Sequence, residues 1–487
     1  MGAMKAAYNA SKIHEYAGNP LIESLGPIET KITKIQKITN RPLYSKDELL
    51  LDADTRVYSL HRLYEIFQPL PIHIDIWNMI HQLLLEGYSS RNPFDKDYKR
   101  FINETGKQII ERKYDINTIG NFHTTASAAL LVGVSGIGKT TSVNRILHQI
   151  PQIIVHNFYR REHFNQIQLT WLKLEVPHNS SLKALCLQYF MKLDELLGTN
   201  NLRKLVSRNL SVDAMIPLIG QSAQSVKLGI LILDESQRLK NRENSKIVDF
   251  FVFLINSIGL PVLIIGTPST YALFESEFRL ARRLTGGGTI FMNRMERDDI
   301  FVLFLESIWP YQWTRKFVPL TSEYVELFYE LTLGISDLVV KLYIFSQATA
   351  ISSGTEVLTP DLIKRTADEK FHAMVPMLNA IHSNNIYKLS QFEDLMEVDK
   401  QKYEKKSGVT KQSIFLHEDN KPNDKKKGTT KTTPLSTNRH SKKNEYVESD
   451  LRNCLLLLKK PDFQCEKWLL EKGLIDDMTD WMGSVDC

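Results

Sequence analysis

Hydrophobic residues in the middle of the chain occur in short unbroken runs that alternate with runs spaced at helical intervals. Short apolar runs are typical of buried parallel strands, whereas apolar positions three and four residues apart are typical of helices. The pattern predicts strands over 128–132, 152–156, 168–176, 228–233 and 262–266, and helices over 141–150, 180–197 and 247–258. Because strands alternate with helices, we expect an α/β domain whose parallel sheet is covered on both faces.

Both flanks of this region are predicted to be helical. Before it, helical spacing covers 48–64 and 72–86, and Gly87 is expected to end the second helix. Between the sheet region and the second flank, Gly286 to Gly288 predict a mobile connection, because glycine is conformationally free. Beyond about residue 294 the predicted helices are 298–309, 322–333, 337–351 and 360–371, the last with Thr359 as N-cap and Pro360 in its first turn.

The composition changes again at about residue 391. Residues 421–443 are rich in Lys, Thr, Ser and Asn with almost no aliphatic side chain, which predicts a disordered basic linker. Apolar residues then return in a segment too short for its own core, so we expect it to fold onto a partner or back onto the helical lid. These residues include Leu451, Leu455, Leu458, Trp468, Leu469 and Trp481. The predicted division of the chain is 1–125, 126–293, 294–390, 391–445 and 446–487.

Composition and charge limit the possible classes of protein. The chain has 487 residues, enough for about three domains, with 43% hydrophobic residues and a formal net charge of +5. This mild basic bias is compatible with nucleic acid as a partner. The four cysteines show no C-x-x-C spacing, so neither structural zinc nor a disulfide framework is expected. No signal peptide or membrane span is predicted, and a cytoplasmic protein is expected.

A glycine-rich loop follows the first predicted strand. Residues Gly133 to Thr140 fit G-x-x-x-x-G-K-[ST] at every specified position, with a strand before the motif and a helix after it. Glycines let backbone N–H groups surround phosphate oxygens, and the helix N-terminus adds its positive dipole end. Lys139 would reach the β- and γ-phosphates, and Thr140 would offer its hydroxyl to Mg²⁺. The alternative is a glycine turn that binds nothing. The flanks favour a site for ATP and Mg²⁺ formed by Gly133, Ser135, Gly136, Ile137, Gly138, Lys139, Thr140 and Thr141.

An acidic pair ends the predicted strand 228–233. Asp234 is expected at the carboxyl edge of the strand, where it can hold Mg²⁺ through water, and Glu235 is placed to polarise the water that attacks the γ-phosphate. Alone, such a pair could be two exposed acidic residues without a catalytic role. After a phosphate loop, it predicts a nucleotide hydrolase rather than a kinase.

Two further features are candidates for catalysis, each with a simpler alternative. Thr267 ends the strand 262–266 and could sense the γ-phosphate, or could simply end a strand before Pro268. Arg282 and Arg283, with Arg279, lie on a predicted helix. They could complete the site of a neighbouring subunit, or form a solvated helical face.

The segment Asp234 to Leu239, DESQRL, resembles the D-E-x-Q-[HR]-L signature of TnsC, the AAA+ regulator of Tns-type bacterial transposons. The likeness extends over roughly residues 8–385 and includes several spaced segments. These are 19–25, 87–88 with 91–93, 178–183, 263–268, 281–283 and 337–342.

The resemblance implies an AAA+ fold and ATP-dependent assembly into rings or helical filaments on duplex DNA. It also implies contacts with a TnsD/TniQ-type target selector and with the TnsA and TnsB transposase, and some relatives belong to CRISPR-associated transposons. The region 1–125 is then expected to contact the target selector or DNA, and 446–487 to dock the transposase, with TnsA as the first candidate. Related initiator-type proteins often have an arginine after a glycine at the start of a lid helix, where it senses the nucleotide. Here Asp337 follows Gly334-Ile335-Ser336, so this sensor arginine is absent or replaced, with Lys341 as the candidate.

Assembly on DNA requires cations spaced along the phosphates. The connections that follow the predicted sheet elements contain seven candidates, although most surface cations bind nothing. They are Lys183, Arg203, Lys204, Arg208, Arg238, Lys240 and Arg242.

Three functions are compatible with these features. The first is an ATP-gated DNA-binding regulator that links target selection to transposition. The second is a nucleotide-switched scaffold ATPase that recruits proteins without touching DNA. The third, a remodelling motor, is disfavoured because no substrate-threading aromatic loop is evident.

Overall fold

The structure is a computed structural model of the chain. It describes residues 2–110, 124–178, 181–207, 210–239, 244–275, 286–376 and 378. The chain divides into two compact units, Met1–Val398 and Asp399–Cys487, and all the described residues belong to the first. The predicted linker 391–445 and docking segment 446–487 lie outside the described residues.

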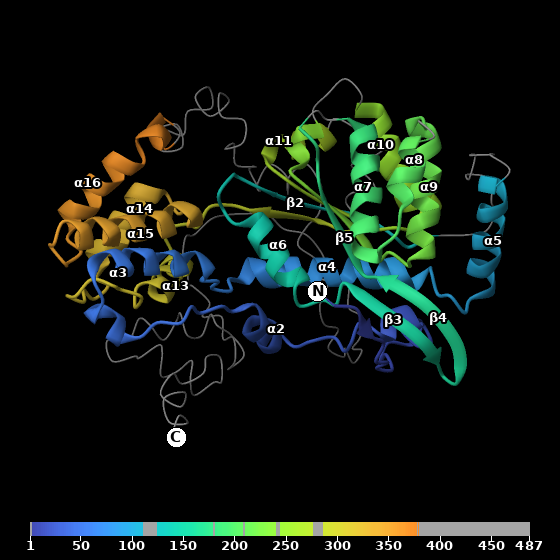
Figure 1. The fold of residues 1–487 in the computed structure, drawn as a ribbon, viewed down its shortest axis with the longest axis horizontal. Helices are drawn as coiled ribbons and strands as arrows, with labels where there is room; N and C mark the ends of the chain where they lie inside the picture. The colour runs from blue at the N-terminus through green and yellow to red at the C-terminus, as the bar shows by residue number, and fades with distance from the viewer. Residues whose placement is uncertain are drawn as a thin grey trace, which may run out of the picture. The chain divides into compact units, whose positions relative to one another are not determined.

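A five-stranded parallel sheet forms the core of the first unit (Figure 1). In the order β5-β6-β7-β2-β8, its strands are Trp171–Glu175, Ile230–Asp234, Val262–Gly266, Ala128–Gly133 and Thr289–Met292. Every residue of β2, β6 and β7 is buried, as expected for strands covered on both faces. The predicted α/β domain with a parallel sheet is therefore confirmed.

Helices pack around this sheet. The long helix α4 (Pro71–Ser89) contacts β2, β6 and β8, and it also contacts α6 (Lys139–Leu147). Elsewhere, α7 (Leu182–Leu197) contacts β5, and α11 (Pro268–Glu275) contacts β7 and β2. No helix among the described residues is long and apolar enough to cross a membrane. The remaining helical elements here are η1 (His14–Tyr16), α1 (Pro20–Glu23), α2 (Lys31–Ile38), α5 (Lys96–Ile110), α8 (Asn201–Ser207), α9 (Val212–Ser225), η5 (Ser236–Leu239), α10 (Asn244–Phe253) and the π-helical turn η6 (Leu254–Ile258).

A β-hairpin beside the core corrects two predicted strands. Strand β3 (Ile153–Tyr159) runs antiparallel to β4 (Glu162–Leu169), and β1 (Met4–Lys5) lies parallel to β3. The single strand predicted over 168–176 is in fact the end of β4 and the whole of β5, separated at Thr170. Arg160 and Arg161 form the hairpin turn with φ of 46° and 73°. Because positive φ is usually supplied by glycine or asparagine, this turn had no signal in the sequence.

Two predicted glycine roles were wrong. Helix α4 does not end at Gly87 but continues to Ser89, and a Cβ at Gly87 would lie 2.4 Å from Pro261 Cγ. This glycine therefore permits close packing instead of ending the helix. Gly287 and Gly288 do not form a mobile connection, because both are hydrogen-bonded to β2. Gly287 N donates to Ala128 O at 3.0 Å, and Gly288 O accepts from Leu130 N at 3.1 Å. They lead into β8, which is too short to show a periodic pattern.

In the part of the chain that the structure describes, four α-helices follow the sheet, as predicted. They are α13 (Asp299–Ile308), α14 (Ser322–Thr332), α15 (Ser336–Ser352) and α16 (Pro360–Lys370), followed by the short turn η7 (His372–Met374). Thr359 caps α16 through its side-chain oxygen, which accepts from Leu362 N, and Pro360 occupies the first turn. We refer to α13–α16 as the helical lid.

An N-terminal segment packs against this lid. The helix predicted over 48–64 is divided into η2 (Lys46–Leu50), α3 (Ala53–Ser59) and η3 (Leu60–Glu65), because Asp52 caps α3 by accepting from Thr55 N at 2.9 Å. Both α3 and η3 contact α15, and Figure 1 shows α3 beside α14 and α15. Residues 46–65 are therefore packed with the lid, although most of the lid lies some 250 to 300 residues later in the chain.

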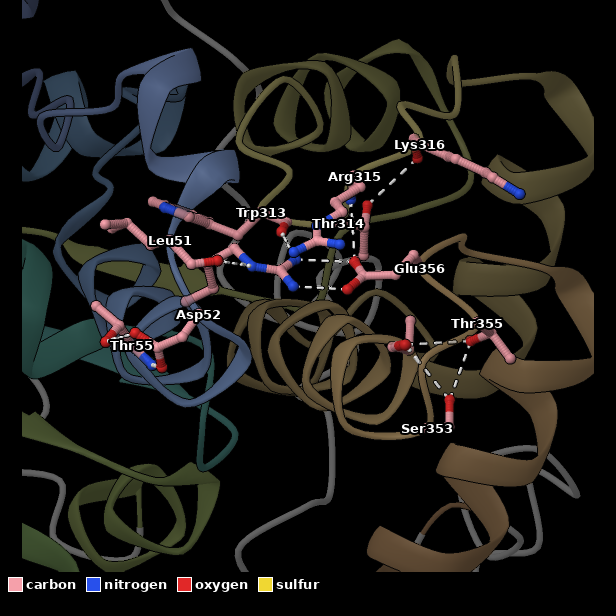
Figure 2. Close-up of polar contacts among 12 residues, drawn as sticks. Leu51, Asp52, Thr55, Trp313, Thr314, Arg315, Lys316, Ser353, Thr355 and Glu356 are labelled. Atoms are coloured by element: carbon pink, nitrogen blue, oxygen red, sulfur yellow. Dashed lines mark hydrogen bonds and ion pairs between the residues drawn. The ribbon is translucent and has the colours of Figure 1, made fainter.

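A buried ion pair fastens this segment to the lid. Arg56 donates to both carboxylate oxygens of Glu356, at 2.6 and 2.8 Å, and to Trp313 O at 2.8 Å. The side chain of Arg56 is 1% exposed and that of Glu356 is 15% exposed. Figure 2 shows the network around Glu356, which also accepts from Arg315 N at 3.1 Å. These hydrogen bonds, those from Arg56 first, hold the pKa of Glu356 below its usual range.

Replacing Arg56 by methionine is expected to lower the free energy of unfolding by about 3 kcal/mol, because the largely buried partner carboxylate would lose both hydrogen bonds from the guanidinium. The matched control is Arg62→Met, whose ion pair with Glu48 is more exposed and should be worth about 1 kcal/mol or less. Urea unfolding of the two variants measures the difference. Equal losses would show that Arg56 does not anchor the segment.

The fold should also lose stability in mild acid through His73. Its Nδ1 accepts from Leu70 N at 2.9 Å at the start of α4, and burial lowers the pKa of His73 to about 4. The unfolded chain takes up this proton near pH 6.5, so the contribution is complete above pH 6.5 and is lost as the pH falls towards 4. The loss should be about 3 kcal/mol. His73→Gln, which keeps an acceptor, should reduce the pH dependence of urea unfolding in this window without abolishing it, because burial also lowers the pKa of His81 to about 4. The exposed-site variant His61→Gln should leave it unchanged. An unchanged pH profile in His73→Gln would contradict this assignment.

Candidate nucleotide site

The predicted phosphate loop joins β2 to α6. Gly136 and Gly138 have φ of 81° and 89°, left-handed conformations that glycine adopts without strain. A Cβ at Gly133 would lie 2.2 Å from a backbone oxygen of β8, so no side chain fits there. The positive φ values let the loop curl around a phosphate, whereas the missing side chain at Gly133 lets the end of β2 pack closely against β8. Of the other loop residues, Ser135 and Thr141 are exposed and Ile137 is buried.

Lys139 begins α6 and lies against the loop. Its Nζ donates to Gly133 O and to Val134 O, each at 2.8 Å. The loop carbonyls thus hold the ammonium next to the backbone that is expected to surround the phosphates. This cradle fits a phosphate group, since it combines glycines of positive φ, a helix N-terminus and a lysine.

Thr140 and Asp234, the two predicted metal ligands, are in contact. Thr140 Oγ1 donates to Asp234 Oδ2 at 2.9 Å, and Asp234 is the buried last residue of β6. Mg²⁺ prefers oxygen ligands and usually takes one or two from the protein, with the rest from phosphates and water. These two oxygens beside a phosphate cradle fit such a site. When bound, Mg²⁺ would neutralise phosphate charge.

Glu235, the predicted base, lies at the open edge of this site. It has φ of 58°, a left-handed conformation that is strained for a residue with a side chain. Its Oε2 accepts from Gln237 Nε2 at 2.8 Å and lies 3.3 Å from Arg238 Nη2, both in η5. The side chain is 39% exposed, so water can reach it. Both of these partners contact Oε2, so neither engages Oε1.

Thr267 follows β7, which lies between β6 and β2 in the sheet. It therefore lies at the same sheet edge as Asp234 and the phosphate loop. Its buried Oγ1 forms a hydrogen bond of 2.9 Å with Ser269 Oγ, in the first turn of α11. The position suits a phosphate sensor, and the bond to Ser269 suits the simpler role at a helix start.

The lid reaches the phosphate loop at the start of α15. Asp337 N donates to Gly136 O at 3.2 Å, and Ser336 Oγ donates to the same oxygen at 3.4 Å. Lys341, the candidate replacement for the missing arginine, lies one turn further and donates to Asp337 Oδ2 at 2.6 Å. A lid movement would thus directly change the surroundings of the loop.

Two residues of the site were not predicted. Lys173 in β5 lies 2.8 Å from Asp234 Oδ2, and its Nζ also donates to Asn144 Oδ1 of α6 at 2.8 Å. The only signal in the sequence is a lysine between two leucines of a predicted strand, which does not reveal the partner.

The structure describes few of the cations predicted to contact DNA and none of the arginines predicted to complete the site of a neighbouring subunit. Lys183 at the start of α7 and Arg203 on α8 are exposed, on two helices that contact each other. Arg238 instead contacts Glu235 and donates to Val176 O at 3.1 Å. The side chain of Lys204, and the whole of Arg208, Lys240, Arg242, Arg279, Arg282 and Arg283, lie outside the described residues.

Other residues that carry the resemblance to TnsC have a structural role. Asn19 Nδ2 donates to Tyr88 O at 2.7 Å, and Tyr88 Oη donates to Lys227 O at 2.9 Å. The buried Arg91 donates to Leu228 O at 2.7 Å. These bonds tie α1 and α4 to the chain that enters β6, so they help to position the strand that carries Asp234.

Comparison with known proteins agrees with this fold. Residues 123–274, which include the phosphate loop and β6, match the family model described as an AAA domain. The match covers less than half of the chain, and the fold is that of an AAA+ P-loop protein. No curated protein matches the sequence.

Several solved structures are similar over part of their length. The ORC2 protein of Aeropyrum pernix is 11% identical, with a TM-score of 0.34, over 55% of this chain and 67% of its own. Drosophila ORC bound to DNA is 12% identical, with a TM-score of 0.36, over 80% and 88%. The Aeropyrum pernix ORC1 protein in complex with DNA is 15% identical, with a TM-score of 0.35, over 61% and 70%. Likenesses this weak do not extend to function.

Proposed function

We propose that this protein is an ATP-dependent regulator of DNA transposition that oligomerises on target DNA and links a target-selection protein to the transposase. One observation carries the nucleotide part of the proposal. One edge of the sheet holds the phosphate loop with Lys139, the contact between Thr140 and Asp234, and Glu235. Residues 123–274, which include this edge, match an AAA domain model.

Each residue then has a role in ATP hydrolysis. Lys139 binds the γ-phosphate, Thr140 and Asp234 hold Mg²⁺, and Glu235 polarises the attacking water. Thr267 senses the γ-phosphate from the neighbouring strand end. Arg282 and Arg283 complete the site of an adjacent subunit, which makes hydrolysis depend on a homo-oligomer.

Binding to double-stranded DNA is the second part of the proposal. It is supported by the resemblance of Asp234 to Leu239 to the TnsC signature and by the mild basic charge of the chain. Lys183 and Arg203 are exposed candidates for phosphate contacts, joined by Lys204, Arg208, Lys240 and Arg242. The contact between Arg238 and Glu235 would connect DNA binding to the catalytic edge.

The partners follow from the same resemblance. The target selector is of the TnsD/TniQ type and contacts the N-terminal region, while residues 446–487 dock the transposase, with TnsA the first candidate and TnsB the second. The cell compartment is the bacterial cytoplasm.

Fluorescence anisotropy of a labelled DNA duplex tests the function. Binding to the duplex should require a slowly hydrolysed ATP analogue and should be weak with ADP. The logarithm of the association constant should fall linearly with the logarithm of the salt concentration, because phosphate contacts release counterions. Oligomers that form with the analogue but leave the duplex free would favour the scaffold ATPase instead.

A further inference from the structure

A lysine side chain reaches the carboxylate that is expected to hold Mg²⁺. Lys173 Nζ lies 2.8 Å from Asp234 Oδ2 and donates to Asn144 Oδ1 at 2.8 Å. Thr140 Oγ1 donates to the same Asp234 oxygen at 2.9 Å. One carboxylate oxygen therefore contacts both a resident cation and the predicted hydroxyl ligand of the metal.

This ion pair is buried, unlike a surface lysine pair. The side chains of Lys173 and Asp234 are 15% and 3% exposed. Strand β5 pairs in parallel with β6, and Lys173 is opposite Ile232, two residues before Asp234. The lysine side chain extends towards the carboxyl edge of the sheet, where its Nζ reaches Asp234 Oδ2.

Electrostatics gives the pair a consequence for metal binding. A buried carboxylate without a cation is costly, so Lys173 stabilises Asp234 while no metal is bound. If Asp234 helped to hold a metal ion, that ion would lie close to the ammonium of Lys173, and two nearby cations repel each other in a partly buried site. The negative charge of a triphosphate would offset that repulsion.

We propose that Lys173 makes metal binding at Asp234 depend on nucleotide, by acting as the counter-cation of this carboxylate in the nucleotide-free protein. Lys173 is a positioning residue, since it acts through Asp234 and not on the reacting atoms. The inference rests on the proposed nucleotide site and adds a residue to it.

Mn²⁺ binding to the nucleotide-free full-length protein, followed by the electron paramagnetic resonance signal of free Mn²⁺, tests the proposal. Lys173→Met and Lys173→Gln remove the charge and should bind Mn²⁺ about tenfold more tightly than the wild type. Lys173→Arg keeps the charge and should remain at the wild-type affinity. The control Lys192→Met removes an exposed lysine that pairs with Glu195 on α7 and should have no effect.

A second readout uses a fluorescent ATP analogue, with its Kd measured in EDTA and in Mg²⁺. Without Lys173 the uncompensated Asp234 should repel metal-free triphosphate, so the ratio of the Kd in EDTA to the Kd in Mg²⁺ should rise about tenfold in Lys173→Met. Lys173→Arg and Lys192→Met should keep the wild-type ratio.

The outcomes separate this inference from the proposed function. If the wild type fails to bind the analogue under both conditions, the nucleotide site itself is wrong. If the wild type binds it while both neutral variants keep wild-type Mn²⁺ affinity and an unchanged ratio, only the role of Lys173 is overturned. Failure of both neutral variants to fold would also overturn it, because the lysine would then be a structural residue.

Discussion

Glu235→Gln is expected to bind ATP with wild-type affinity and to hydrolyse it about 10²- to 10⁴-fold more slowly, because an amide cannot take a proton from water. Glutamine has nearly the same size and can still accept from Gln237 Nε2, so the turn η5 should be preserved. The retained triphosphate should also prolong complexes with DNA. Phosphate release under saturating ATP, together with DNA dissociation rates, measures both effects.

The matched control is Glu195→Gln, which changes an exposed carboxylate on α7 that pairs with Lys192. It should hydrolyse ATP at the wild-type rate. A wild-type rate in Glu235→Gln would place the base elsewhere and would leave Glu235 as a structural residue of a strained turn.

Lys139→Ala should weaken ATP binding by about 10- to 100-fold, because the phosphates lose a charge-assisted hydrogen bond. The same substitution removes both bonds from Nζ to the loop carbonyls, and assembly on DNA that depends on nucleotide should be lost with it. Titration with a fluorescent ATP analogue measures the affinity, and sedimentation with duplex DNA measures assembly.

Lys192→Ala is the control for this variant, since it also removes one lysine but at an exposed position. It should behave as the wild type in both assays. Normal ATP affinity and normal assembly in Lys139→Ala would contradict the assignment of the phosphate loop.

Much of the sheet could be predicted from the sequence because buried parallel strands are nearly continuous apolar runs, as in β6 and β7. The strand β8 could not, because it has only four residues and is recognised by its pairing with β2. The hairpin turn could not be predicted because Arg160 and Arg161 adopt positive φ angles at positions where glycine is usual. The interpretation of Gly87 as a helix stop failed because its close neighbour, Pro261, is distant in the sequence.

The candidate site also has parts that the sequence predicts and parts that it does not. The phosphate loop and the acidic pair are local motifs, and the strand order brings Thr140 and Asp234 together across the sheet. The contact of Lys173 with Asp234 depends on the register between β5 and β6, which no local pattern reports. The packing of residues 46–65 on the lid depends on Arg56 and Glu356, which are 300 positions apart, so no short sequence window contains it.

The central claim is that ATP drives this chain to assemble on duplex DNA. Electron microscopy of the full-length protein with duplex DNA and a slowly hydrolysed ATP analogue tests it most directly. The account predicts rings or filaments that enclose the duplex with the analogue and are absent with ADP. Empty rings beside bare DNA would contradict it.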